Sequence, residues 1–128
     1  IRKELIMNLS FQEIRKAPFT VKSSIKNLKK TYAMQLHMAK LQDSFSEDEP
    51  IESMQAISDS LQATVDYVVD MLKLKPNEVD KLEELDQEEL TALAQRLNLR
   101  IMGMSEQEIE DIQNESDEEG LEQAQANE

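Results

Sequence analysis

The sequence predicts a mainly α-helical fold: a small bundle of four to five helices, with a short N-terminal extended segment or β-hairpin as an open alternative. The 128 residues include only two glycines and three prolines, and aromatic side chains make up 4%. Straight-chain residues that favour helices dominate, while the turn residues that an all-β fold needs are scarce. The apolar side chains also recur at three- and four-residue spacing, as in amphipathic helices. The chain length suits one domain with a small core.

The N-terminal segment has two interpretations. Its apolar and polar side chains alternate, which favours a short strand, whereas Ser10 and Glu13 fit the capping box of a short helix. Pro18 ends either element. The alternating apolar residues are Leu5, Met7, Leu9 and Phe11.

Two long amphipathic helices are predicted next. The first runs from Val21 to about Gln42, with Thr20 as its cap. The second starts at Pro50, which suits a first helical turn, and ends before Pro76. An acidic loop joins them. The stripes expected to face the core are Val21, Ile25, Leu28, Tyr32, Leu36 and Ala39 in the first helix, and Met54, Ile57, Leu61, Val65, Val68 and Leu72 in the second.

Shorter helices are predicted in the rest of the chain. Asn77 can cap the first of them, and Asp86 with Glu89 forms a capping signal for the next. Gly103 is a helix stop, and Ser105 opens a further capping box. The apolar positions of these helices are Val79, Leu82 and Leu85, then Leu90, Leu93, Leu97 and Ile101, then Ile109 and Ile112.

The charges of the chain are divided by sign along its length. Residues 1–40 carry nine Lys and Arg against two Glu, whereas residues 41–128 carry five basic residues against twenty-five acidic ones. This division favours head-to-tail association of copies, which salt would weaken; polyanion binding and plain solvated faces are the alternatives. We expect a helical domain at 1–104 and an acidic extension at 105–128, a short helix followed by a tail. The residues predicted to carry self-association are Lys22, Lys26, Lys29, Lys30, Glu115, Asp117, Glu118 and Glu119.

Both long helices also carry apolar residues outside their predicted core stripes. A helix that is apolar on two sides is either the central member of a bundle or lends one side to a partner. Unbranched Met side chains suit imperfectly matched partners. Both alternatives stay open at this point. The predicted partner-binding residues are Met34, Met38, Leu41, Tyr67, Met71 and Leu74.

The sequence offers little for catalysis, cofactors or membranes. With no Cys and one His, neither a disulfide framework, a thiolate zinc site nor a histidine triad is expected, and His37 is expected to be structural. The stretch "ESDEEG" resembles the start of a calcium loop, but Ala126 stands where the bidentate Glu is required. No apolar run is long enough to span a membrane. We expect a soluble, cytoplasmic protein that is not an enzyme.

Three stretches together resemble a known family. They are "KAPFTVKSSIKNLKK", which opens the basic helix, "LQATVDYVVDML" in the second helix and "LDQEELTALAQRL" in a later one. Over about residues 3–104 the chain is similar to tail assembly chaperones of long-tailed phages, and more narrowly to the tape measure protein chaperones of phages of Gram-positive bacteria. The resemblance implies a helical, non-enzymatic protein that self-associates and coats the tape measure protein. Such a protein would act in the cytoplasm of the bacterial host and be absent from the mature virion.

Other function classes compete with this resemblance. A nucleic-acid-binding regulator could use the lysine-rich helix, although the net charge of -13 opposes approach to a polyanion. An acidic inhibitor of a nucleic-acid-binding protein is supported by the net charge alone. A structural assembly subunit without a client differs from a chaperone because it is retained in the product.

Overall fold

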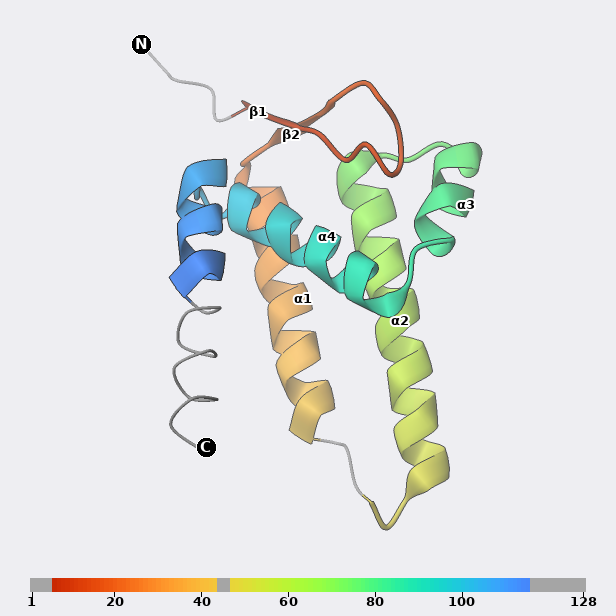
Figure 1. Ribbon diagram of the computed structural model, residues 1–128. Helices are drawn as coiled ribbons and strands as arrows, with labels where there is room; N and C mark the ends of the chain where they lie inside the picture. The colour runs from red at the N-terminus through yellow and green to blue at the C-terminus, as the bar shows by residue number, and fades with distance from the viewer. Residues whose placement is uncertain (1–5, 44–46, 116–128) are drawn as a thin grey trace, which may run out of the picture.

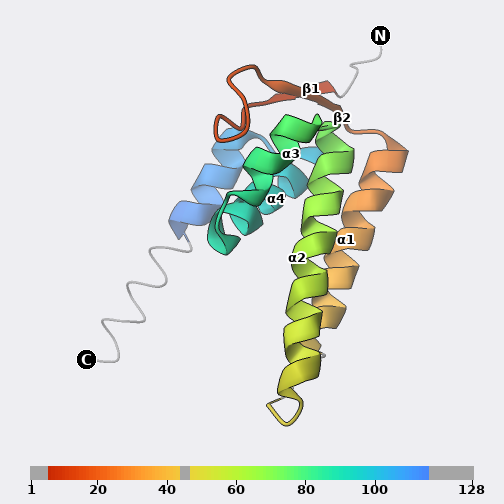
Figure 2. The ribbon, with the colours of Figure 1, turned by 90° about the vertical axis from the view of Figure 1, so that its right-hand side faces the viewer.

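Two long helices, α1 (Ile25–Asp43) and α2 (Pro50–Leu72), lie side by side and antiparallel in the computed structural model (Figure 1). The structure describes residues 6–43 and 47–115. Near one end of the helix pair, α3 (Pro76–Glu83) and α4 (Gln87–Ile101) pack with a small N-terminal sheet (Figure 2). A further helix covers residues 106–115. The predicted mainly α-helical bundle with an N-terminal β-hairpin is confirmed.

The N-terminal sheet consists of β1 (Ile6–Leu9) and β2 (Phe19–Lys22), which pair antiparallel with Leu9 opposite Phe19. Leu9, Phe19 and Val21 are buried, so the alternation of the sequence places one face of this hairpin on the core. The prediction that a helix begins at Val21 with Thr20 as its cap is wrong, because both residues belong to β2.

Helix α1 starts later, after Ser24. The amide of Asn27 donates to Ser24 Oγ at 3.1 Å, the geometry of an N-cap. The shift from the predicted start arises because the pairing of β2 with β1 provides hydrogen-bond partners for residues 19–22. Those residues therefore need no helical bonds.

Local signals set the ends of the remaining helices. Pro50 occupies the first turn of α2, and Lys73 ends that helix in the left-handed region with φ 53°. The cap of α3 is Lys75 and not the predicted Asn77, because Pro76 takes the first helical position. The predicted capping box of α4 is confirmed: the Glu89 amide donates to Asp86 Oδ1 at 2.8 Å, and the Asp86 amide donates to Glu89 Oε1 at 3.1 Å.

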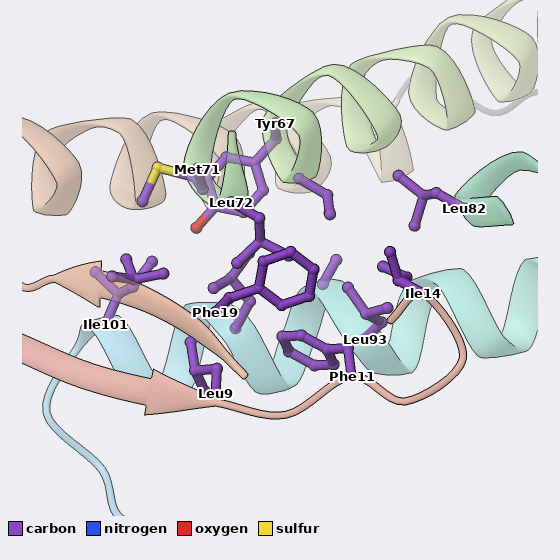
Figure 3. Packing of buried hydrophobic residues seen from close by; sticks show 14 of the residues in the cluster. Leu9, Phe11, Ile14, Phe19, Tyr67, Met71, Leu72, Leu82, Leu93 and Ile101 are labelled. Carbon is purple, nitrogen blue, oxygen red and sulfur yellow. The ribbon is translucent and has the colours of Figure 1, made fainter. Parts of the chain in front are cut away.

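The core lies where α4, the C-terminal half of α2 and the hairpin meet, as Figure 3 shows. The rings of Phe11 and Phe19 lie 6.3 Å apart, centroid to centroid, at a 46° tilt. The predicted stripe of α4 is confirmed, since all four of its residues are buried. These residues are Leu90, Leu93, Leu97 and Ile101.

The core face predicted for the first long helix is wrong. Ile25, Tyr32 and Leu36 are 70%, 53% and 57% exposed, whereas Thr31 and Met34 are buried. Helix α1 therefore turns a different side toward α2 and α4, and of the predicted stripe within this helix only Leu28 packs against the core.

Charge explains which side of α1 is buried. Lys26, Lys29 and Lys40 lie on one flank of the helix, next to the exposed apolar stripe. The arc of α1 without charged side chains is centred close to Thr31, and burial of that arc leaves the ammonium groups in water.

Residues 106–115 form the helix that the Ser105 capping box predicts. The Glu108 amide donates to Ser105 Oγ at 3.2 Å, and Ile109 is buried. Gly103, at φ 103°, lies between this helix and α4. The described part of the acidic extension thus packs on the rest of the chain, while the division at residue 104 stays a prediction.

Candidate functional site

The α1–α2 pair projects beyond the core as a two-helix stem. The last buried residue of α1 is Met34, and the first buried residue of α2 is Thr64. We define the stem as residues 35–43 and 50–63, and Figure 2 shows it extending away from α3, α4 and the sheet. The predicted core stripe of α2 is therefore correct for its C-terminal part only: Met54 is 69% exposed, and Ile57 is also exposed.

An open groove of ≈ 400 Å³ lies where α4 crosses the helix pair. Helices α1, α2 and α4 all contribute to its walls. The groove is lined by Met34, Gln35, Met38, Ala39, Thr64, Thr91, Ala94, Gln95 and Asn98.

The predicted partner-binding residues occupy three environments. Met34 and Met38 line the groove, where Met38 is half-buried, and Leu41 is half-buried in the stem. Tyr67 and Met71 are buried in the core of the isolated chain, and Leu74 packs against that core. Contact of these residues with another protein stays a prediction.

A buried hydrogen bond joins the two long helices beside the core. Thr31 Oγ1 and Tyr67 Oη lie 2.7 Å apart. Burial raises the pKa of the Tyr67 phenol above its usual value, and the hydrogen bond with Thr31 partly opposes this rise. The bond aligns α1 with α2 just above the stem.

The outer face of α1 combines apolar and basic side chains. Ile25, Tyr32 and Leu36, which we call the outer stripe, lie next to exposed lysines. Of the lysines predicted to carry self-association, Lys22, Lys26 and Lys29 are exposed. Lys30 differs, because its Nζ lies 2.6 Å from Asp70 Oδ2.

The acidic counterpart lies on the helix of residues 106–115. Glu115, predicted to carry self-association, is exposed there, and Ile112 is 45% exposed. The other three acidic residues of that prediction, Asp117, Glu118 and Glu119, lie outside the described residues.

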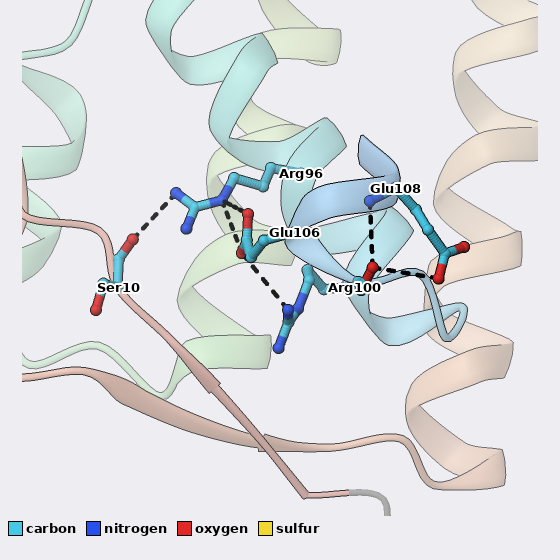
Figure 4. A network of polar contacts seen from close by, with 6 residues as sticks. Ser10, Arg96, Arg100, Glu106 and Glu108 are labelled. Carbon is cyan, nitrogen blue, oxygen red and sulfur yellow. Dashed lines mark hydrogen bonds and ion pairs between the residues drawn. The ribbon is translucent and has the colours of Figure 1, made fainter. Parts of the chain in front are cut away.

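Two arginines fix this acidic helix, as Figure 4 shows. Arg96 Nε lies 2.9 Å from Glu106 Oε2, and Arg96 Nη1 donates to the carbonyl oxygen of Ser10 at 3.0 Å. The same guanidinium lies over the Phe11 ring, 4.8 Å from its centroid. Arg100 adds a longer contact of 3.8 Å to Glu106.

A third arginine, Arg15, holds the N-terminal loop on α3. Arg15 lies 3.8 Å from the Phe19 ring centroid, and its Nη1 lies 3.4 Å from Glu78 Oε2. A hydrogen bond from the Lys75 amide, helped by the charge of Arg15, lowers the pKa of the Glu78 carboxyl below its usual value although burial opposes the shift. The roles of Arg15, Arg96 and Arg100 were not predicted from the sequence, in which the small number of arginines in an acidic chain was the available signal.

Across residues 6–43 and 47–115, no group of three or more His, Cys, Asp or Glu side chains is arranged to hold a metal ion. Within the same ranges, no helix is both long and apolar enough to cross a membrane.

Comparison with known proteins identifies the family. The family model described as "Phage tail assembly chaperone proteins, TAC" matches residues 7–118 of the 128. No curated protein and no solved structure matches the chain. The matched range contains all of the hairpin except Ile6, both long helices, the groove and the helix at 106–115. The chain therefore belongs to the family of phage tail assembly chaperone proteins.

Proposed function

We propose that this tail assembly chaperone binds the tape measure protein of its phage and keeps it soluble while the tail forms. The observation that carries the proposal is the concentration of exposed apolar side chains on α1 and α2. Among the described residues, nine large apolar side chains are exposed, and six of them lie on these two helices. They are Ile25, Tyr32, Leu36, Ile51, Met54 and Ile57.

Such a surface favours contact with another apolar helix. Burial of one large apolar side chain stabilises a complex by about 1.5–3 kcal/mol, before the entropic cost of association is subtracted. Met38 and Leu41 add half-buried apolar area to the stem, which supports the predicted partner-binding role for this part of α1. The binding mode is that of a helix in an apolar groove.

Self-association is the second part of the proposal. Figure 2 shows α1 and the helix at 106–115 on opposite sides of the molecule, so a contact between the basic flank of one copy and the acidic helix of the next would be head to tail. A head-to-tail contact generates a ring or an open helical array, depending on the rotation between subunits. An array can coat a long client in the host cytoplasm and leave before the virion is complete.

Co-expression tests the client. The tape measure protein of the same phage is produced alone and together with this chain, and its soluble fraction is measured after nuclease treatment and a high-salt wash. We expect the tape measure protein to be mostly insoluble alone and to co-purify with the chaperone when both are present. An unchanged soluble fraction contradicts the proposal, and binding that nuclease abolishes supports the nucleic-acid alternative instead.

Light scattering tests the self-association. Lys26→Glu with Lys29→Glu reverses the charge of the basic flank, and we expect a smaller mean mass at low salt because the acidic helix of the next copy is repelled. Lys73→Glu with Lys81→Glu is the matched control, since these exposed lysines lie on other surfaces. Equal masses for the two double variants contradict the head-to-tail contact.

A further inference from the structure

The groove between α1, α2 and α4 points to the chemistry of the bound segment. We propose that it holds an uncharged, apolar helical segment of the client, which packs beside α4 and extends along the stem. This inference rests on the proposed chaperone function and adds the place and the chemical class of the bound segment.

The walls of the groove carry no charge. None of its nine lining residues is Asp, Glu, Lys or Arg, although 32% of the residues of the chain are charged. Charged side chains on a bound segment would lose water there without gaining a partner. Apolar, hydroxyl and amide side chains lose less hydration free energy than charged ones, so the walls select an uncharged segment.

The surface along which the bound helix lies is indicated by the packing of α4. Helix α4 packs on both α1 and α2, and the buried α2 residues at this level include Val68 and Leu72. The same face of α2 continues into the stem at three- and four-residue spacing through Leu61, Ile57 and Met54. A helix in the groove therefore meets the same kind of surface that already holds α4.

A second copy of this chain is a poorer occupant of the groove. Its exposed helix at 106–115 carries five carboxylates, which the uncharged walls cannot pair. That helix instead fits the outer face of α1, where Lys26 and Lys29 are exposed. The charge pattern thus assigns the client to the groove and the acidic helix of the neighbouring copy to the exposed lysines on the basic flank of α1.

Charge insertion tests the assignment. Ala39→Arg and Thr91→Arg place a guanidinium in the groove from two different helices, at exposed positions where folding should be retained. Ala33→Arg and Ala92→Arg are matched controls on the same two helices, away from the groove. Each variant is co-expressed with the tape measure protein, and circular dichroism checks its helicity.

We expect the groove variants to lower the co-purified tape measure protein at least tenfold and the controls to change it less than twofold. If wild-type protein captures the tape measure protein and the groove variants match the controls, the groove assignment is overturned while the chaperone function stands. If wild-type protein captures none, both proposals are overturned.

Cross-linking identifies the bound segment itself. The chain has no cysteine, so Ala39→Cys gives a single thiol in the groove for a photo-reactive maleimide. We expect cross-links to uncharged helical segments of the tape measure protein, as read by mass spectrometry. Cross-links to Lys- or Glu-rich segments, or to residues 105–128 of a second copy, overturn the assignment.

Discussion

The orientation of α1 can be tested with a pair of substitutions only two residues apart. Met34→Ala removes a side chain that is 9% exposed, and Leu36→Ala removes one that is 57% exposed. The orientation predicted from the apolar stripe makes Leu36 the core residue, whereas the structure makes Met34 the core residue. The two orientations therefore predict opposite orders of stability.

The size of the difference follows from burial. Burying a complete Met or Leu side chain contributes about 1.5–3 kcal/mol. Met34 is almost fully buried but borders the groove, so the cavity left by truncation is open and adds little, and we expect a loss of about 2 kcal/mol. Leu36 is less than half buried and Ala is the better helix former, so its truncation should cost at most about 1 kcal/mol.

Urea unfolding followed by circular dichroism at 222 nm measures both values. The experiment is done at low protein concentration and high salt, which keep copies apart. Association through the outer stripe would stabilise the folded wild-type protein and would enlarge the apparent loss of stability in Leu36→Ala. Equal urea dependence of the unfolding free energy in the two variants shows that the comparison is valid. If Leu36→Ala loses as much stability as Met34→Ala, the orientation of α1 described here is refuted.

Two further substitutions test polar contacts. Tyr67→Phe removes the buried bond to Thr31 and should lower the unfolding free energy by about 1 kcal/mol in urea, whereas no change would show that the bond contributes nothing to stability. Glu78→Gln tests the lowered pKa of Glu78. The stabilisation by the ionised Glu78 carboxyl is fully present above the unfolded-state pKa and is lost as pH falls through the folded-state pKa. The midpoint temperature of thermal unfolding should therefore fall more steeply with acid for the wild-type protein than for the variant. Identical pH profiles would contradict this account.

Three helix-end signals read from the sequence are confirmed because each acts within a few residues, whereas the predicted starts of α1 and α3 were wrong. Pro50 at a first turn, the reciprocal bonds of Asp86 with Glu89, and the positive φ of Gly103 need no distant partner. The C-terminal half of β2 was assigned to the first long helix because Val21 also continues the apolar spacing of that helix. The competing pairing with β1 joins Phe19 to Leu9, across a loop that periodicity does not describe.

The candidate site was less predictable, since periodicity shows which residues share a face but not which of two faces is buried. Met34 and Met38 were recognised as one face of the first helix, yet the position of α4 across that face depends on packing far along the chain. The contact of Arg96 with the Ser10 carbonyl group joins residues 86 positions apart. Neither arrangement leaves a signal in a short window of sequence.

The distribution of buried residues along the stem also has a dynamic consequence. Local unfolding requires least free energy where few apolar contacts are lost, and the buried residues of the helix pair stop at Met34 and Thr64. Amide hydrogen exchange should therefore quicken progressively toward the connection between the two helices, while the opposite end exchanges only on global unfolding. The free end of the stem is therefore expected to open locally at a lower free energy than the core does.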